Sequence, residues 1–193
     1  MSDSTLSAEL QTNMAGHVWA KQEILSLTNE LSEEQFNWRP EDGAWSVAEC
    51  IDHLLSVGEA MTPLMNSSIA DAREKGITGD GPFSYGFLGN KFIQAAGEQK
   101  NPGKGKVKSP KLYVPESDHE KDSLVARFTQ LQDDLIACNR DARGINLKRV
   151  KITSPAIRIF RISLGQWLIM LPNHQKRHFQ QARRVLEKMP NLS

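Results

Sequence analysis

The stretch LGQWLIMLPNHQKRHFQQARRVL, residues 164–186, carries the clearest helical pattern of the chain. Its apolar residues recur at steps of three and four, which places them on one face of an α-helix. Ser163 and Gln166 have the spacing of a capping box, which marks a helix start. His174 and His178 lie on the same stripe one turn apart, so both imidazoles project from one face. This spacing allows two imidazoles to bind one metal ion.

Three further segments have the amphipathic pattern of a helix, and no segment shows a strong alternation typical of strands. They are residues 5–30, residues 47 to about 75 and residues 117–138. The second and third begin at capping boxes, Ser46 with Glu49 and Ser117 with Glu120. The sequence therefore predicts an all-α fold, a four-helix bundle.

Residues 76–116 interrupt this pattern with glycines and prolines, and only the part from 85 to 97 could form a short helix. Five lysines and no acidic residue lie between 100 and 115. Connections this long are unusual inside a compact domain and often act as lids or binding loops. We expect a long irregular excursion between the second and third helices. It is either a solvated surface segment or a partial cover, with Phe83–Phe92 walling a pocket and the 104–111 lysines binding carboxylates.

Composition narrows the class of protein. A chain of 193 residues is expected to form a single domain, residues 1–193. A net charge of +1 gives no general attraction to nucleic acid or anionic membranes. The two cysteines do not make a disulfide framework, and Met1–Ser4 does not begin a signal peptide. The longest apolar run, residues 167–171, is too short to span a bilayer. We expect a cytoplasmic protein with a small-molecule substrate, no nucleic acid and no membrane.

A third histidine belongs with the pair. His53 lies on the apolar stripe of the second helix, and a bundle brings facing stripes together in its core. His53, His174 and His178 would then supply three nitrogens and leave a fourth position open, as in catalytic zinc sites, although nickel, iron or manganese also suit imidazole. The alternative is that each is a hydrogen-bonded core residue. The remaining histidines, His17 and His119, are expected at the surface or rim.

Other residues near these histidines are candidates for a substrate pocket. They are Trp45, Cys50, Trp167, Arg177 and Gln181. Cys50, one turn before His53, could also be a fourth ligand or a redox thiol, although a buried cysteine is more often a small apolar filler. Glu49 lies one turn from His53 and is the one candidate base, although its place in a capping box already explains it.

These motifs, in this order, resemble those of the DinB/YfiT-like superfamily. The segment Trp45–Glu49 followed by His53-Leu54, with Arg39-Pro40 and Gly43 before it, is similar to the second-helix motif of that family. The segment His174–Gln181 is similar to its closing motif, and the resemblance covers nearly the whole chain. It implies a four-helix bundle with a divalent metal, zinc or nickel, on the three histidines, and homodimers in many members. Relatives are described as metal-dependent hydrolases or as S-transferases that use low-molecular-weight thiols.

The metal suggests the chemistry. A cation with three neutral ligands keeps its full charge, so it lowers the pKa of a bound water or holds a thiol as thiolate. Thiol transfer requires no protein nucleophile, whereas hydrolysis by a metal-bound water calls for a base nearby. We therefore expect metal-activated thiol transfer to a small molecule. The alternatives are a metal-dependent hydrolase and a non-enzymatic bundle that acts through protein partners. The long excursion departs from the family pattern, so the substrate does not follow from the resemblance.

Overall fold

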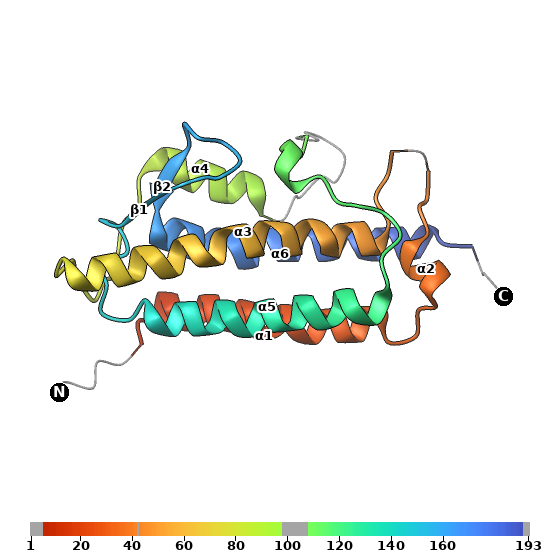
Figure 1. Ribbon diagram of the computed structural model, residues 1–193, viewed down its shortest axis with the longest axis horizontal. Coiled ribbons are helices and arrows are strands. Elements are labelled where there is room, and N and C mark those ends of the chain that lie inside the picture. Colours follow the sequence, from red (N-terminus) through yellow and green to blue (C-terminus); the bar gives the residue numbers. More distant parts are fainter. Residues whose placement is uncertain (1–5, 42, 98–107, 191–193) are drawn as a thin grey trace.

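Four long helices dominate the computed structural model, which describes residues 6–41, 43–97 and 108–190. Within this part they are α1 (Ala8–Thr28), α3 (Val47–Glu74), α5 (Lys121–Asp141) and α6 (Leu164–Lys188). They form two layers, α1 with α5 and α3 with α6, and each helix contacts helices of both layers (Figure 1). The predicted all-α four-helix bundle is confirmed. None of the described helices combines the length and the apolar character that a membrane span requires.

The excursion is a crossover connection. Helices α3 and α5 run in the same direction, opposite to α1 and α6, so α3 ends at the far end of the bundle from the start of α5 (Figure 1). The chain between them must therefore return along the whole bundle. It does so over the α3–α6 layer, and it forms α4 (Phe87–Ala96) and the short 3-10 turn η1 (Lys111–Tyr113) on the way.

Capping boxes explain where two of the long helices begin. Those predicted at the starts of α3 and α6 are both present, and a third precedes the short helix α2 (Glu33–Asn37). The predicted helix start at Ser117 is wrong, because α5 begins at Lys121 with Glu120 as its N-cap. Asp118 has a φ of 63°, in the left-handed region, so the chain makes a turn where the sequence suggested a first helical residue.

A two-stranded ribbon between α5 and α6 was not predicted. Strands β1 (Lys151–Thr153) and β2 (Arg161–Ser163) are antiparallel and pair Ile152 with Ile162. Both isoleucines are buried, and the indole N–H of Trp167 donates to the carbonyl of Ile152 at 3.2 Å. Each strand has only three residues, which is too short for an alternating pattern to be recognised.

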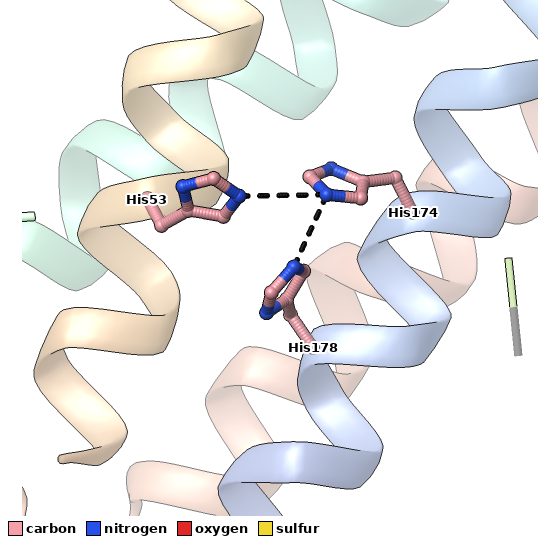
Figure 2. A group of neighbouring side chains, drawn as sticks. All are labelled: His53, His174 and His178. Atoms are coloured by element: carbon pink, nitrogen blue, oxygen red, sulfur yellow. Dashed lines mark hydrogen bonds between the residues drawn. The ribbon is translucent and has the colours of Figure 1, made fainter. Parts of the chain in front are cut away.

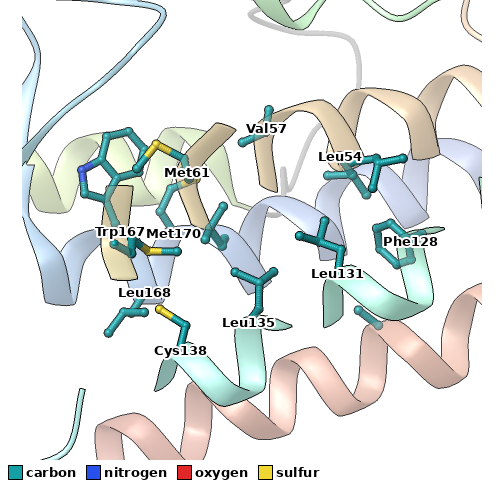
Figure 3. Packing of buried hydrophobic residues seen from close by; sticks show 14 of the residues in the cluster. Leu54, Val57, Met61, Phe128, Leu131, Leu135, Cys138, Trp167, Leu168 and Met170 are labelled. Carbon is teal, nitrogen blue, oxygen red and sulfur yellow. The ribbon is translucent and has the colours of Figure 1, made fainter. Parts of the chain in front are cut away.

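Close helix contacts depend on two glycines. Apolar side chains of α3, α5 and α6 interlock between the layers (Figure 3). A Cβ atom on Gly58 of α3 would lie 2.4 Å from a methyl carbon of Leu131 on α5. A Cβ atom on Gly16 of α1 would lie 2.7 Å from the Cβ of Pro172, which lies inside α6. The second contact fixes α6 against α1 in the turn just before His174.

The expected surface position of His17 is wrong. Its side chain is completely buried, and Nδ1 lies 3.0 Å from Oε1 of Gln132 on α5. The amide of Gln175 on α6 donates to the same oxygen at 3.0 Å. Burial lowers the pKa of His17 to about 4. The apolar pattern of α1 misleads, because Val18 and Leu25 are exposed while polar side chains of the same helix face the core.

Candidate metal centre

The three predicted ligands meet between α3 and α6. Figure 2 shows His53 of α3 and His174 and His178 of α6 pointing toward one another. Nε2 of His174 lies 3.4 Å from Nε2 of His53 and 3.1 Å from Nε2 of His178. One ring nitrogen of each residue lies within 4.8 Å of the other two. A tetrahedral ion with metal–nitrogen bonds of about 2.0–2.1 Å separates its ligands by about 3.3 Å, so both contacts have a suitable length.

The second nitrogen of His53 fixes its orientation. Nδ1 lies 2.7 Å from the carbonyl oxygen of Tyr113, to which its N–H donates. The lone pair is then on Nε2, which faces the other two histidines. The hydroxyl of Ser109 donates to the same carbonyl at 3.1 Å. Tyr113 ends η1, so the crossover connection supplies the outer support of this histidine.

His178 has a different neighbour. Its Nδ1 is buried without a hydrogen-bond partner among the described residues. The side chain of Gln181, one turn further along α6, interacts with the ring and acts to raise its pKa, although it makes no regular hydrogen bond to Nδ1. Gln181 is therefore placed to support His178 as the Tyr113 carbonyl supports His53.

All three histidines are held neutral. Burial lowers the pKa of His174 to about 3, and the charges of His53 and Arg177 act in the same direction. Burial also lowers the pKa of His53 and, more strongly, that of His178. A neutral imidazole is the form that binds a metal, so the site is ready for a cation at neutral pH.

The donor set fits a divalent transition metal. Three neutral imidazole nitrogens converge, and the described residues contain no other such cluster of histidine, cysteine and acidic side chains. Imidazole ligands suit zinc, nickel and iron better than calcium or magnesium, which prefer oxygen. His53, His174 and His178 would hold the ion, which leaves a further position for a substrate group.

Two other predicted pocket residues lie beside the histidines. The indole of Trp45 stacks on the ring of His178, with 5.7 Å between centroids, and its centroid lies 5.0 Å from that of His53. The guanidinium of Arg177 donates to the carbonyl of Ala95, in the last turn of α4, at 2.8 Å. Trp45 therefore forms an aromatic wall, and Arg177 contributes a positive charge that acts on all three histidines.

Three other candidate residues have packing or hydrogen-bonding roles in the fold. Cys50 is completely buried, and burial raises its pKa well above the usual range, so it is a thiol that fills the core. Trp167 lies under β1, about 10 Å before His174 along the helix axis. The carboxylate of Glu49 accepts two hydrogen bonds from Arg39, at 2.6 and 2.8 Å, and one from the Ser46 amide. We therefore assign Glu49 no role as a base.

The structure describes only part of the excursion that was predicted to wall a pocket and bind carboxylates. Lys104 and Lys106 lie outside the described residues, as does the side chain of Phe92, whereas Lys108 is exposed. Phe87 is 70% exposed. Sequence reasoning missed the Tyr113 carbonyl and the Ser109 hydroxyl. A backbone carbonyl carries no residue signature, so no sequence signal identified this support.

Comparisons with known proteins agree with this architecture. The DinB superfamily profile matches residues 17–182. The uncharacterised protein YuaE of Bacillus subtilis (strain 168) is 24% identical over 160 residues, which is 82% of this chain and 88% of YuaE. YfiT from Bacillus subtilis, described as a probable metal-dependent hydrolase with an unusual four-helix bundle topology, has the same fold. It aligns with a TM-score of 0.62 at 14% identity, over 98% of this chain and 92% of YfiT. Because the profile spans most of the chain and includes all three histidines, this protein belongs to the DinB superfamily.

Proposed function

We propose that this DinB-family protein binds a divalent metal ion through His53, His174 and His178 and catalyses a metal-dependent reaction of a small molecule, with thiol transfer as the favoured reaction. The convergence of three neutral imidazoles, with Nε2 separations of 3.1 and 3.4 Å, carries this proposal. When bound, a divalent ion with three neutral ligands supplies a positive charge that makes a thiol or a water nucleophilic at neutral pH. The indole of Trp45 covers one side of the cluster and limits the access of water there.

The surrounding carboxylates favour thiol transfer over hydrolysis. Hydrolysis calls for a base that accepts a proton from the attacking water. Glu49 is already bound by Arg39 and by the Ser46 amide. One oxygen of Asp52 accepts from the Glu116 amide at 3.0 Å. A thiol, with an ordinary pKa of about 8.5, loses its proton far more easily and does not depend on such a base.

Hydrolysis at the same centre is the second candidate function. It is supported by the fold shared with YfiT, which is described as a probable metal-dependent hydrolase. A non-enzymatic bundle would need neither a bound metal nor a pocket next to the histidines.

Metal content tests the proposal directly. The wild type, loaded with zinc or nickel and dialysed, should carry about one ion per chain by elemental analysis. His53→Ala and His174→Ala should lose the ion and keep the helical circular dichroism spectrum. His119→Ala is the matched control, because its ring lies 3.6 Å from Asp52, outside the cluster. Variants that retain as much metal as the wild type would contradict the site.

The reaction class needs a second assay. Metal-loaded protein is incubated with a panel of low-molecular-weight thiols and an electrophilic acceptor, and in parallel with ester and amide substrates without thiol. Thiol-dependent product that disappears in His53→Ala supports transfer. Thiol-independent product that disappears in the same variant supports hydrolysis instead.

A further inference from the structure

Two arginines on α6 differ from the arginines that form ion pairs. Arg177 and Arg184 are two turns apart, both are partly buried, and neither forms an ion pair with a described carboxylate. By contrast, three other arginines each pair with a glutamate: Arg39 with Glu49, Arg127 with Glu59, and Arg183 with Glu23. A partly buried guanidinium without an anionic partner is costly, so these two positions call for an explanation.

The crossover connection holds Arg177 next to the histidines. The contact with the Ala95 carbonyl uses one of the five N–H groups of a guanidinium and leaves the others available. On α6, Arg177 directly precedes His178 and lies one turn after His174, so its side chain leaves the helix next to two of the candidate ligands.

Positive charge exceeds negative charge around this centre. Arg177 and Arg184 both lie on α6, two turns apart, and both are partly buried. Arg184 also acts on Cys50, one turn before His53, so it lies on the same side of the bundle. Of the two carboxylates nearby, Glu49 pairs with Arg39, which leaves the single charge of Asp52 against those of Arg177 and Arg184. A divalent ion would add two more positive charges, which only an anionic ligand would offset.

We propose that Arg177 anchors an oxyanion of the substrate, a carboxylate or a phosphate group, next to the metal ion, with Arg184 adding to the positive field. This inference rests on the proposed function and names the substrate class of the same site. The planar guanidinium binds two oxygens of such a group through parallel hydrogen bonds. A groove along the contact of α4 and α6 opens to solvent beside Lys176, the residue before Arg177. It is lined by Ile93, Gln94, Gly97, Asn173 and Lys176.

The test uses the cobalt-substituted protein, whose visible absorption bands report on groups bound next to the metal. Succinate, inorganic phosphate and the neutral analogue succinamide are titrated separately, and both anions are followed by calorimetry as well. One or both anions should give saturable spectral changes, and succinamide none. Arg177→Gln should keep the cobalt bands and weaken anion binding about 10- to 100-fold. Arg177→Lys, which keeps the charge and loses the fork, should fall in between.

Arg158→Gln is the matched control, because it removes the same charge from an exposed position in the loop between β1 and β2. It should bind the anions like the wild type. The inference is overturned if neither anion binds, if succinamide binds as tightly as succinate, or if Arg177→Gln binds as tightly as the wild type. Tighter binding of succinate or of phosphate identifies the oxyanion. If cobalt does not bind, the proposed function fails. Calorimetry on the metal-free protein then tests the anion site alone, because the inference requires that anion binding be weaker in Arg177→Gln than in the wild type.

Discussion

Acid should destabilise the metal-free protein between pH 7 and pH 5, because four histidines, three of them buried and His174 partly buried, are held neutral in the fold. Burial lowers the pKa of His17 to about 4 and that of His174 to about 3, and it also lowers those of His53 and His178. In the unfolded chain each pKa is about 6.5. Between these values the unfolded state binds more protons than the folded state, so the free energy of unfolding decreases as the pH decreases.

The size of the effect follows from the difference in proton binding. At pH 5 a histidine of the unfolded chain is about 97% protonated. Each histidine that stays neutral in the fold therefore lowers the free energy of unfolding by about 2 kcal/mol relative to pH 8. His17 is completely buried and contributes this amount. His174 keeps some exposed surface, so we take about 1–2 kcal/mol for it. His53 and His178 add in the same direction. Glu9, whose pKa burial raises, acts in the opposite direction between its ordinary value and that raised value.

Urea denaturation in the presence of a chelator, at pH values from 8 to 5, measures this effect through tryptophan fluorescence and circular dichroism. The free energy of unfolding should be nearly constant from pH 8 to 7.5 and then decrease by at least about 3 kcal/mol by pH 5. The variant His17→Gln removes one titrating group, so the slope near pH 5 should decrease by about 1.4 kcal/mol per pH unit. A total decrease below about 1 kcal/mol in the wild type would refute the conclusion that burial keeps these histidines neutral.

Three further perturbations test the packing and the site. Gly16→Ala should cost about 1–3 kcal/mol in urea denaturation, because its Cβ would lie 2.7 Å from the Cβ of Pro172. Trp45→Phe should abolish most of the metal-dependent change in tryptophan fluorescence, because this indole packs on two of the three histidines. Ser109→Ala should weaken zinc binding up to about tenfold in competition with a chromophoric chelator, because its hydroxyl holds the Tyr113 carbonyl that fixes a ligand.

Each of these has a matched control. Gly86→Ala places its Cβ in open space and should change stability by less than about 0.5 kcal/mol, and equal costs for the two glycine variants would contradict the packing argument. Trp38 has no ring contact with a histidine among the described residues, so Trp38→Phe should keep the fluorescence change. Ser84 is exposed in the same crossover connection, so Ser84→Ala should bind zinc like the wild type. If Ser84→Ala binds zinc as weakly as Ser109→Ala, the weaker binding does not depend on the Tyr113 carbonyl.

The helices and the three converging histidines follow from local sequence signals. The apolar stripes have the period of a helix, and His53, His174 and His178 lie on two of these stripes. Two capping boxes mark helix starts correctly, whereas the one at Ser117 does not, because Asp118 adopts a left-handed conformation. A pattern of residue types indicates that a cap is available, but the neighbouring backbone decides whether the helix uses it.

The burial of His17 and the support of His53 depend on contacts between distant parts of the chain. His17 is stabilised by Gln132, which is 115 residues away, and the apolar residues of its own helix do not mark the buried face. His53 donates to the Tyr113 carbonyl, which is 60 residues away. Such partners become visible only when the packing of the helices is known.

The topology of the bundle explains why the crossover connection takes part in the candidate site. Because α3 and α5 are parallel, the chain must return along the bundle, and it does so over the α3–α6 layer that carries the histidines (Figure 1). The carbonyl of Ala95, in α4, accepts a hydrogen bond from Arg177, and the carbonyl of Tyr113, in η1, accepts one from His53. The same segment therefore orients a candidate metal ligand and the proposed anion anchor. Its length is required by the connection, and its contacts give that length a role at the candidate metal centre.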